Sequence, residues 1–150
     1  MKKVSLILGM TIFSLSALAS SEGVISIASL AAQPSTKTAF KKLAGKMALP
    51  VWVTQGGVNS KNEKVVIKGK TYIVLNACKP HDCSSESMAL LYNPDTKTMA
   101  GVLSSENEED HTQTLRWLNI PDELEIDGKT VLYASLSGSL SNHPSLFNYP

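Results

Sequence analysis

The chain has 150 residues, of which 43% are hydrophobic, and its 14 lysine and arginine residues nearly balance its 13 aspartate and glutamate residues. A chain of this length fits one domain with a single core. The near-zero net charge argues against a nucleic-acid-binding protein, because such proteins usually carry a strongly basic face.

The first 19 residues are typical of a secretory signal peptide. Lys2 and Lys3 precede an apolar stretch, and Ala17 and Ala19 form an A-x-A cleavage pattern. The alternative is a membrane-spanning helix, but a span needs roughly 20 apolar residues, and the polar sequence SSE follows at once. We therefore expect a signal peptide over residues 1–19, a single mature domain over residues 20–150, and export to the periplasm without a membrane anchor.

The N-terminal part of the mature chain has helical patterns. Residues 20–34 are small and mildly apolar, which fits either a short helix or a packed arm. The segment PSTKTAFKKLAGKM has apolar residues on one side and lysines on the other, which predicts an amphipathic helix capped by Ser35 or Thr36. Pro50 ends this helical region, and the sequence VWV that follows is strand-like.

Alternating strands and tight turns come next. KVVI and TYIVLNA flank the turn sequence KGK, and SMALLY and KTMAGVL flank NPDT, so we expect antiparallel hairpins between residues 51 and 103. The acidic segment SSENEEDHTQ is expected to be exposed. TLRWLNI gives no clear assignment, and KTVLYASLSGSL fits a helix better than a strand.

Large apolar side chains are expected to form the core, with two more in the tail docking on it: Phe40, Trp52, Tyr72, Trp117, Phe147 and Tyr149. Together these elements predict an α+β fold, in which an antiparallel meander sheet of about five strands carries amphipathic helices packed on one face.

The only two cysteines, Cys78 and Cys83, stand at the ends of the sequence CKPHDC between two predicted strands. In an exported chain two cysteines most simply form one disulfide. A closed ring that contains Pro80 would leave His81 little conformational freedom. It would also present this side chain from the end of a rigid sheet, where binding residues tend to lie.

Four interpretations of this loop are compatible with its residues. It is a structural turn with an incidental histidine, a metal site, a reactive cysteine, or a loop that enters the cleft of a partner. A metal site is disfavoured because three ligands within six residues give poor tetrahedral geometry and oxidation removes the thiolates. A reactive cysteine is disfavoured because the spacing is not C-x-x-C. We therefore expect no metal, no cofactor and no catalytic residue.

An imidazole suits one kind of cleft well. When it is protonated, both ring nitrogens donate hydrogen bonds. His81 could therefore bridge two carboxylates that face each other, such as the pair that flanks the scissile bond in glycoside hydrolases.

The sequence resembles the Ivy family, the periplasmic inhibitors of vertebrate (c-type) lysozyme in Gram-negative bacteria. ACKPHDC looks like the inhibitory loop of that family. Further similar stretches are LPVWVTQGG, RWLNI, IDGKTVLYASLSGSL and NHPSLFNY, so the resemblance covers essentially the whole mature chain. It implies that the loop closed by Cys78 and Cys83 plugs the lysozyme cleft with His81 against the two catalytic carboxylates. Lys79, Pro80 and Asp82 would shape the loop and contact the rim of the cleft.

The resemblance also implies an inhibitor without enzyme activity, whose partner is a c-type lysozyme and which is either a monomer or a homodimer. Such lysozymes are often strongly basic, so the acidic run of Glu106, Glu108, Glu109 and Asp110 could steer association. A solvated loop without this role is the simpler interpretation. The alternative function is a periplasmic binding or chaperone-like module, or a controller of the cell's own lytic transglycosylases.

Overall fold

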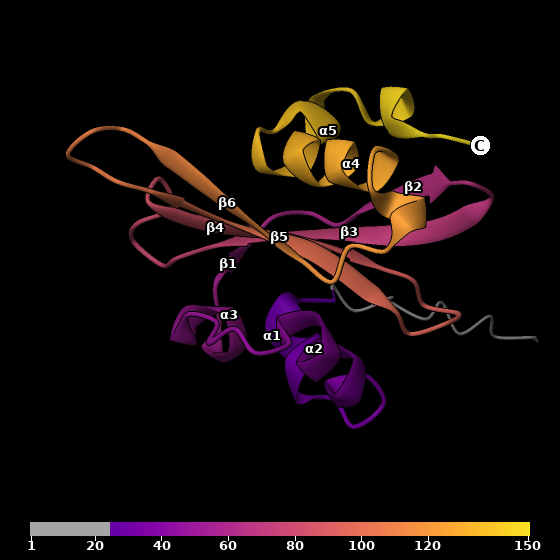
Figure 1. Cartoon of the computed structure of the whole chain (residues 1–150), viewed down its shortest axis with the longest axis horizontal. Coiled ribbons are helices and arrows are strands. Elements are labelled where there is room, and N and C mark those ends of the chain that lie inside the picture. Colours follow the sequence, from indigo (N-terminus) through magenta and orange to yellow (C-terminus); the bar gives the residue numbers. More distant parts are fainter. Residues whose placement is uncertain (1–24) are drawn as a thin grey trace, which may run out of the picture.

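The computed structural model describes residues 25–150 and shows one antiparallel sheet with a helical layer on each side (Figure 1). The predicted signal peptide lies outside the described residues. In chain order the elements are α1 (Ile27–Ala32), α2 (Lys37–Ala44), α3 (Val51–Gln55), β1 (Val58–Asn59), β2 (Glu63–Ile67), β3 (Lys70–Cys78), β4 (Glu86–Tyr92), β5 (Met99–Glu106), β6 (Gln113–Leu118), η1 (Asp122–Leu124), α4 (Asp127–Leu136), α5 (Ser139–Asn142) and η2 (Pro144–Phe147).

Strands β2 to β6 form a meander in which each strand pairs antiparallel with the next. The short strand β1 pairs with the last two residues of β3, on the same edge that β2 occupies further along. Because the meander reverses at each turn, the β3–β4 and β5–β6 connections lie at one end of the sheet. The β2–β3 and β4–β5 turns lie at the opposite end.

Both faces of the sheet are buried, because successive residues in its central strands are apolar. In β3, Leu75 and Ala77 pack with α1, α2 and α3, whereas Tyr72 and Val74 point to the opposite face and pack with α4 and α5. Strands β4 and β5 continue both layers, since side chains in a strand alternate between the two faces. The result is two separate apolar clusters, one on each side of the sheet.

The predicted α+β fold class is confirmed, with two differences in detail. The sheet has six strands where about five were expected, and helices cover both of its faces, although the sequence pattern predicted helices on one face. The physical reason is visible in β4, where the five residues from Met88 to Tyr92 are all buried. Such unbroken apolar runs are typical of strands that are covered on both sides.

The strand-like VWV segment is a correction, since it forms the helical turn α3. Pro50 is its N-cap residue, with a φ of −55° and a ψ of 144°. The half-buried Trp52 packs on the sheet, and Val53 is buried. Tertiary packing therefore overrides the β propensity of valine and tryptophan.

The other predicted segments correspond to one strand and three helices of the structure. The amphipathic helix is α2, which begins after Thr36, but the Thr36 hydroxyl donates to the carbonyl of Leu30 and does not cap the helix. TLRWL lies in β6, and KTVLYASLSGSL contributes to α4 and α5. Phe40 and Tyr72 are buried, whereas Trp52 and Trp117 are half-buried at the edges of the clusters.

The C-terminal tail docks as expected. Phe147 and Tyr149 pack against the cluster under α4, and Tyr149 forms a parallel bridge with Ile67 of β2. Within residues 25–150, no helix is long and apolar enough to cross a membrane.

Candidate functional site

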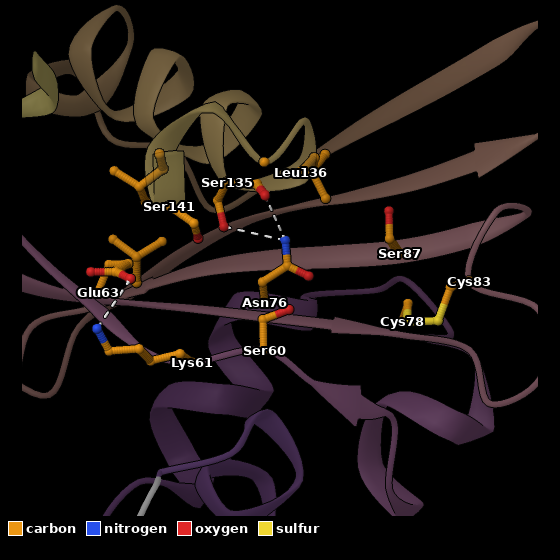
Figure 2. A pocket seen from close by; sticks show the side chains of 13 residues that line it. Ser60, Lys61, Glu63, Asn76, Cys78, Cys83, Ser87, Ser135, Leu136 and Ser141 are labelled. Atoms are coloured by element: carbon orange, nitrogen blue, oxygen red, sulfur yellow. Dashed lines mark hydrogen bonds and ion pairs between the residues drawn. A yellow bond between two sulfur atoms is a disulfide. The ribbon is translucent and has the colours of Figure 1, made fainter. Parts of the chain in front are cut away.

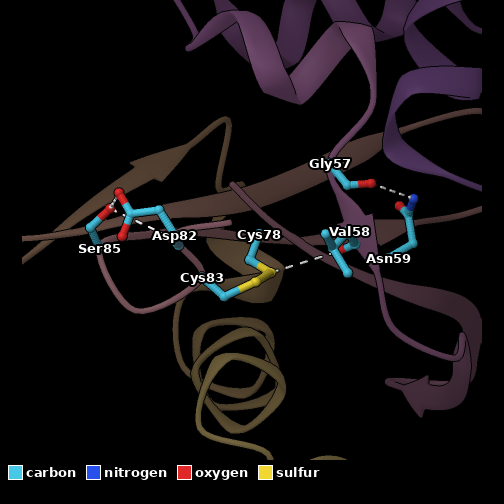
Figure 3. Close-up of a disulfide and its surroundings, with 7 residues drawn as sticks. All are labelled: Gly57, Val58, Asn59, Cys78, Asp82, Cys83 and Ser85. Atoms are coloured by element: carbon cyan, nitrogen blue, oxygen red, sulfur yellow. Dashed lines mark hydrogen bonds between the residues drawn. A yellow bond between two sulfur atoms is a disulfide. The ribbon is translucent and has the colours of Figure 1, made fainter. Parts of the chain in front are cut away.

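The loop of residues 79–85 joins β3 to β4 and is closed at its base by the predicted disulfide. Cys78 is the last residue of β3, and its sulfur is bonded to that of Cys83, with the two Cα atoms 4.8 Å apart. Figure 3 shows the disulfide beside β1, where the Cys78 Sγ atom lies 3.8 Å from the carbonyl oxygen of Val58. The two sulfurs are bonded to each other, so neither is a free thiolate that could bind a metal or act as a nucleophile.

The tip of the loop is a tight turn over residues 79–82. The amide of Asp82 donates to the carbonyl oxygen of Lys79 at 3.1 Å. Pro80 takes the second position of this turn and His81 takes the third, where its φ is +63°. Proline followed by a residue with positive φ is the pattern of a type II turn, and the third position of such a turn favours glycine. His81 therefore occupies a backbone conformation that costs it free energy.

The charged residues of the turn bind each other. The Lys79 amine lies 2.8 Å from Oδ2 of Asp82, and the Ser85 hydroxyl donates to the same oxygen. These contacts hold the pKa of the Asp82 carboxyl below its ordinary value, and Asp82 in turn raises the pKa of the Lys79 amine. The expectation that both residues shape the loop agrees with this geometry, and their contact with a partner stays a prediction.

His81 differs from its neighbours because its side chain is exposed and is engaged in none of the hydrogen bonds or ion pairs found among residues 25–150. The neighbouring polar side chains of Lys79, Asp82 and Ser85 bind one another within the loop. The imidazole is thus the group that the loop leaves available to a partner.

Residues outside the predicted site support the base of the loop, and no local sequence pattern indicates them. The amide of Lys79 donates to the carbonyl of Glu86 at 3.0 Å, and the Glu86 carboxylate accepts a hydrogen bond of 2.6 Å from the indole nitrogen of Trp52. A Cβ atom on Gly57 would lie 2.9 Å from both the Cys78 carbonyl oxygen and the Trp52 ring. Only glycine therefore allows the chain after α3 to pack against the root of the loop.

A second hairpin lies beside the loop. The amide of Glu106 donates to the carbonyl of Ser85 at 2.8 Å, so the turn between β5 and β6 starts next to the loop's last residue. This turn carries Glu108, Glu109 and Asp110, all of them exposed. The predicted acidic run is therefore an exposed turn at the same end of the sheet as the disulfide.

A polar hollow of about 260 Å³ lies behind the disulfide, between β3 and the layer of α4 and α5 (Figure 2). Asn76 crosses it and donates to the carbonyl of Ser135 at 2.8 Å. The disulfide forms one end of this hollow. The hydrogen bond from Asn76 to Ser135 ties β3 to α4 two residues before Cys78. It therefore adds to the rigidity of the strand that carries the loop.

The described residues contain no group of three or more histidine, cysteine, aspartate or glutamate side chains that could hold a metal ion. The site therefore consists of an exposed imidazole on a rigid loop beside an acidic turn. This arrangement suits contact with another molecule.

Comparison with known proteins agrees with this arrangement. A family model described as inhibitor of vertebrate lysozyme (Ivy) matches residues 35–135. A protein named inhibitor of vertebrate lysozyme from Escherichia coli (strain K12) is 43% identical over 125 residues, which cover 83% of this chain and 80% of the relative. A protein of the same name from Pseudomonas aeruginosa is 28% identical over 75 residues, or 49% of each chain. The chain thus belongs to the Ivy family, which is a family of inhibitor proteins and not of enzymes.

Proposed function

We propose that this protein inhibits vertebrate (c-type) lysozyme in the periplasm, and that it does so by placing the disulfide-closed loop 78–83 in the active-site cleft with His81 against the catalytic carboxylates. The observation that carries this proposal is the exposed imidazole on a disulfide-closed loop, in a chain 43% identical to a protein named as such an inhibitor.

The loop's order before binding supports this mechanism. Fixing a flexible side chain at an interface costs roughly 0.5–1.5 kcal/mol. The disulfide, the turn and the pairing of Lys79 with Asp82 already restrict the loop in the free protein. Most of the binding free energy is then available for contacts with the enzyme.

The chemistry of the target supports the choice of imidazole. Glycoside hydrolases carry a pair of carboxyl groups at the cleavage point, one of which is protonated in the working enzyme. A histidine can donate from one or both ring nitrogens according to its protonation state. His81 can therefore match such a pair of carboxyl groups. Inhibition follows because the loop occupies the substrate-binding site of the enzyme, and no chemical step is needed.

The negative charge near the loop also favours a basic lysozyme as the partner. Asp82, Glu86, Glu106 and the acidic turn gather carboxylates at the end of the sheet that carries the loop. An acidic region around the contact loop would attract a basic enzyme and orient it before contact.

The proposal predicts that His81→Ala weakens inhibition of c-type lysozyme by about 2 kcal/mol or more, which is a rise of about thirtyfold in the inhibition constant. The measurement is the lysis rate of bacterial cell walls by lysozyme at increasing inhibitor concentrations. His143→Ala is the matched control, because His143 is an exposed histidine in the C-terminal segment. It should leave the inhibition constant unchanged.

Equal inhibition by His81→Ala and the native protein would contradict the role of His81. If the native protein has no effect on lysozyme but slows a lytic transglycosylase in a parallel assay, the target is one of the cell's own enzymes and the proposal is wrong.

A further inference from the structure

The helical layer formed by α1, α2 and α3 has an unusual distribution of charge. Residues 25–57 contain four lysines, Lys37, Lys41, Lys42 and Lys46, and no aspartate, glutamate or arginine. All four lysines are exposed. Two carboxylates from other elements lie beside this layer: Glu86 contacts Trp52 at the end that carries the loop, and Glu123 lines a pocket together with Lys42. The layer therefore presents a face of one sign, although the described chain is close to neutral.

An apolar groove of about 370 Å³ opens in the same layer. Its apolar lining comes from α1, α2 and the segment after α2, including Phe40, Met47 and Leu49, and Lys37, Lys41 and Thr54 of α3 also line it. Val51, at the start of α3, is 65% exposed. In the sequence it lies between the groove-lining residues Leu49 and Thr54, and contiguous apolar patches with a polar rim mark protein or membrane contact sites.

The combination of lysines and apolar groups indicates the kind of partner. A hydrated polymer of carboxylates would use the lysines and leave the groove empty. The surface of an anionic bilayer offers both phosphate groups for lysines and hydrocarbon for apolar side chains. Helices that lie in the plane of such a surface combine these two features. A strongly basic enzyme, in contrast, would be repelled from this face.

We propose that the cationic face, defined by Lys37, Lys41, Lys42, Lys46 and the groove beside α2, binds reversibly to membranes that contain anionic phospholipid. The lysines lie at the level of the phosphates, and Val51 and the groove meet the outer part of the acyl chains. No spanning helix is needed for this contact.

The position of the cationic face leaves the inhibitory loop free. The three helices cover one broad face of the sheet, whereas the loop 79–85 projects from one end of it, beside the β5–β6 turn (Figure 1). The acidic turn next to the loop points away from an anionic surface if that surface is bound by the lysines. Membrane binding and binding through the loop are therefore compatible in one molecule.

The test is co-sedimentation of the mature protein with two kinds of vesicle, made of phosphatidylcholine alone or of phosphatidylcholine mixed with phosphatidylglycerol. The protein is expected to sediment with the anionic vesicles at low ionic strength and to be released as salt is added. Lys37→Gln/Lys41→Gln should lower the partition coefficient roughly tenfold or more, because each lysine next to an anionic surface contributes about a factor of five. Val51→Ser should lower it several-fold without changing the salt dependence.

Lys68→Gln/Lys129→Gln is the matched control, because it removes the same charge outside the helical layer formed by α1, α2 and α3. It should retain most of the vesicle binding. The proposal is overturned if the native protein stays in the supernatant with anionic vesicles, or if both double variants lose binding equally. Binding to isolated peptidoglycan but not to vesicles would also overturn it and assign the face to a polymer. Lysozyme inhibition should be the same in all these variants, so the outcome is independent of the function proposed above.

Discussion

At residue 81 a histidine occupies a backbone conformation that favours glycine. The φ of His81 is +63°, and with Pro80 before it this positive φ identifies a type II turn, whose third position favours glycine. Residues that are held in such a conformation cluster at functional sites, where the surrounding structure imposes it. Here the disulfide and the pairing of Lys79 with Asp82 supply that constraint.

Because of this conformation, two substitutions of His81 should differ in protein stability while they weaken lysozyme inhibition equally. His81→Gly should be more stable to unfolding than His81→Ala by about 1 kcal/mol, because a Cβ atom is disfavoured at positive φ. Both variants lack the imidazole and should lose inhibition to a similar extent. Chemical denaturation measures the first effect, and the lysozyme assay measures the second.

His143 supplies the control for this comparison, since its φ is −139°. At that site the alanine variant should be the more stable one, because glycine gains more freedom in the unfolded chain. If His81→Ala is as stable as His81→Gly, the proposed turn geometry is wrong.

The pairing of Lys79 with Asp82 gives the loop a defined pH dependence. The pKa of the Asp82 carboxyl lies below its ordinary value of 3.8 because Lys79 and Ser85 donate hydrogen bonds to the carboxylate. A lowered pKa means that ionised Asp82 stabilises the folded loop. This stabilisation is present above pH 3.8 and is lost as the pH falls through the lower pKa of the folded state.

We therefore expect loop amides such as that of Asp82 to stay protected from hydrogen exchange down to about pH 4. NMR titration of the Asp82 carboxyl carbon should give a midpoint below 3.8. Asp82→Asn should show a more mobile loop at neutral pH. A titration midpoint at or above the ordinary value would show that the pairing does not order the loop in solution.

At the scale of elements, the loop depends on helix α3, which lies far from it in the sequence. Glu86 at the start of β4 accepts a hydrogen bond from Trp52, and its carbonyl accepts one from Lys79. The two contacts connect one helical turn, the root of β4 and the first residue of the loop. Helix α3 is therefore a support of the loop as well as a part of the core.

The hydrogen bond between Trp52 and Glu86 predicts different effects for two substitutions of Glu86. Glu86→Ala leaves the indole nitrogen of Trp52 without its partner, which costs about 1–3 kcal/mol of stability for a half-buried group, and it should weaken inhibition. Glu86→Gln keeps an oxygen that can accept the hydrogen bond and should behave much like the native protein. Urea denaturation and the lysozyme assay distinguish the two. Equal losses in both variants would mean that the negative charge of Glu86, and not the contact with Trp52, is what matters.

The sequence predicted those elements whose signals are local. Turn sequences such as NPDT identify the hairpins, and the lysine and apolar pattern identifies α2. The ring from Cys78 to Cys83 could be predicted because two cysteines allow only one pairing within a chain. The contacts at the base of this ring could not be predicted, because Trp52 and Glu86 form their hydrogen bond although they are 34 residues apart in the sequence. The strand-like VWV segment was misassigned for a similar reason, since its helical form depends on packing against the sheet.

Charge is distributed unevenly over the molecule, although the chain is nearly neutral. Carboxylates gather around the loop and the β5–β6 turn, and lysines gather on the layer of α1, α2 and α3. The meander topology produces this arrangement, because it brings the β3–β4 and β5–β6 connections to the same end of the sheet. In the sequence these two acidic segments are separated by β4 and β5.

The acidic end should accelerate association with a basic enzyme. Glu108→Gln/Glu109→Gln is expected to lower the association rate constant several-fold at low salt and to weaken its salt dependence, with little change in the dissociation rate. Stopped-flow fluorescence measures both rates. Asp95→Asn/Asp122→Asn is the control, because these exposed carboxylates lie outside the loop and the β5–β6 turn. Equal rates for the two double variants would show that the acidic turn is only a solvated loop.

A crystal structure of the inhibitor bound to c-type lysozyme would show where the loop lies in the complex. We expect residues 79–82 to lie inside the active-site cleft, with the His81 ring within hydrogen-bond distance of the catalytic carboxyl groups. If these residues face solvent while another surface of the inhibitor covers the enzyme, the loop is not the inhibitory element.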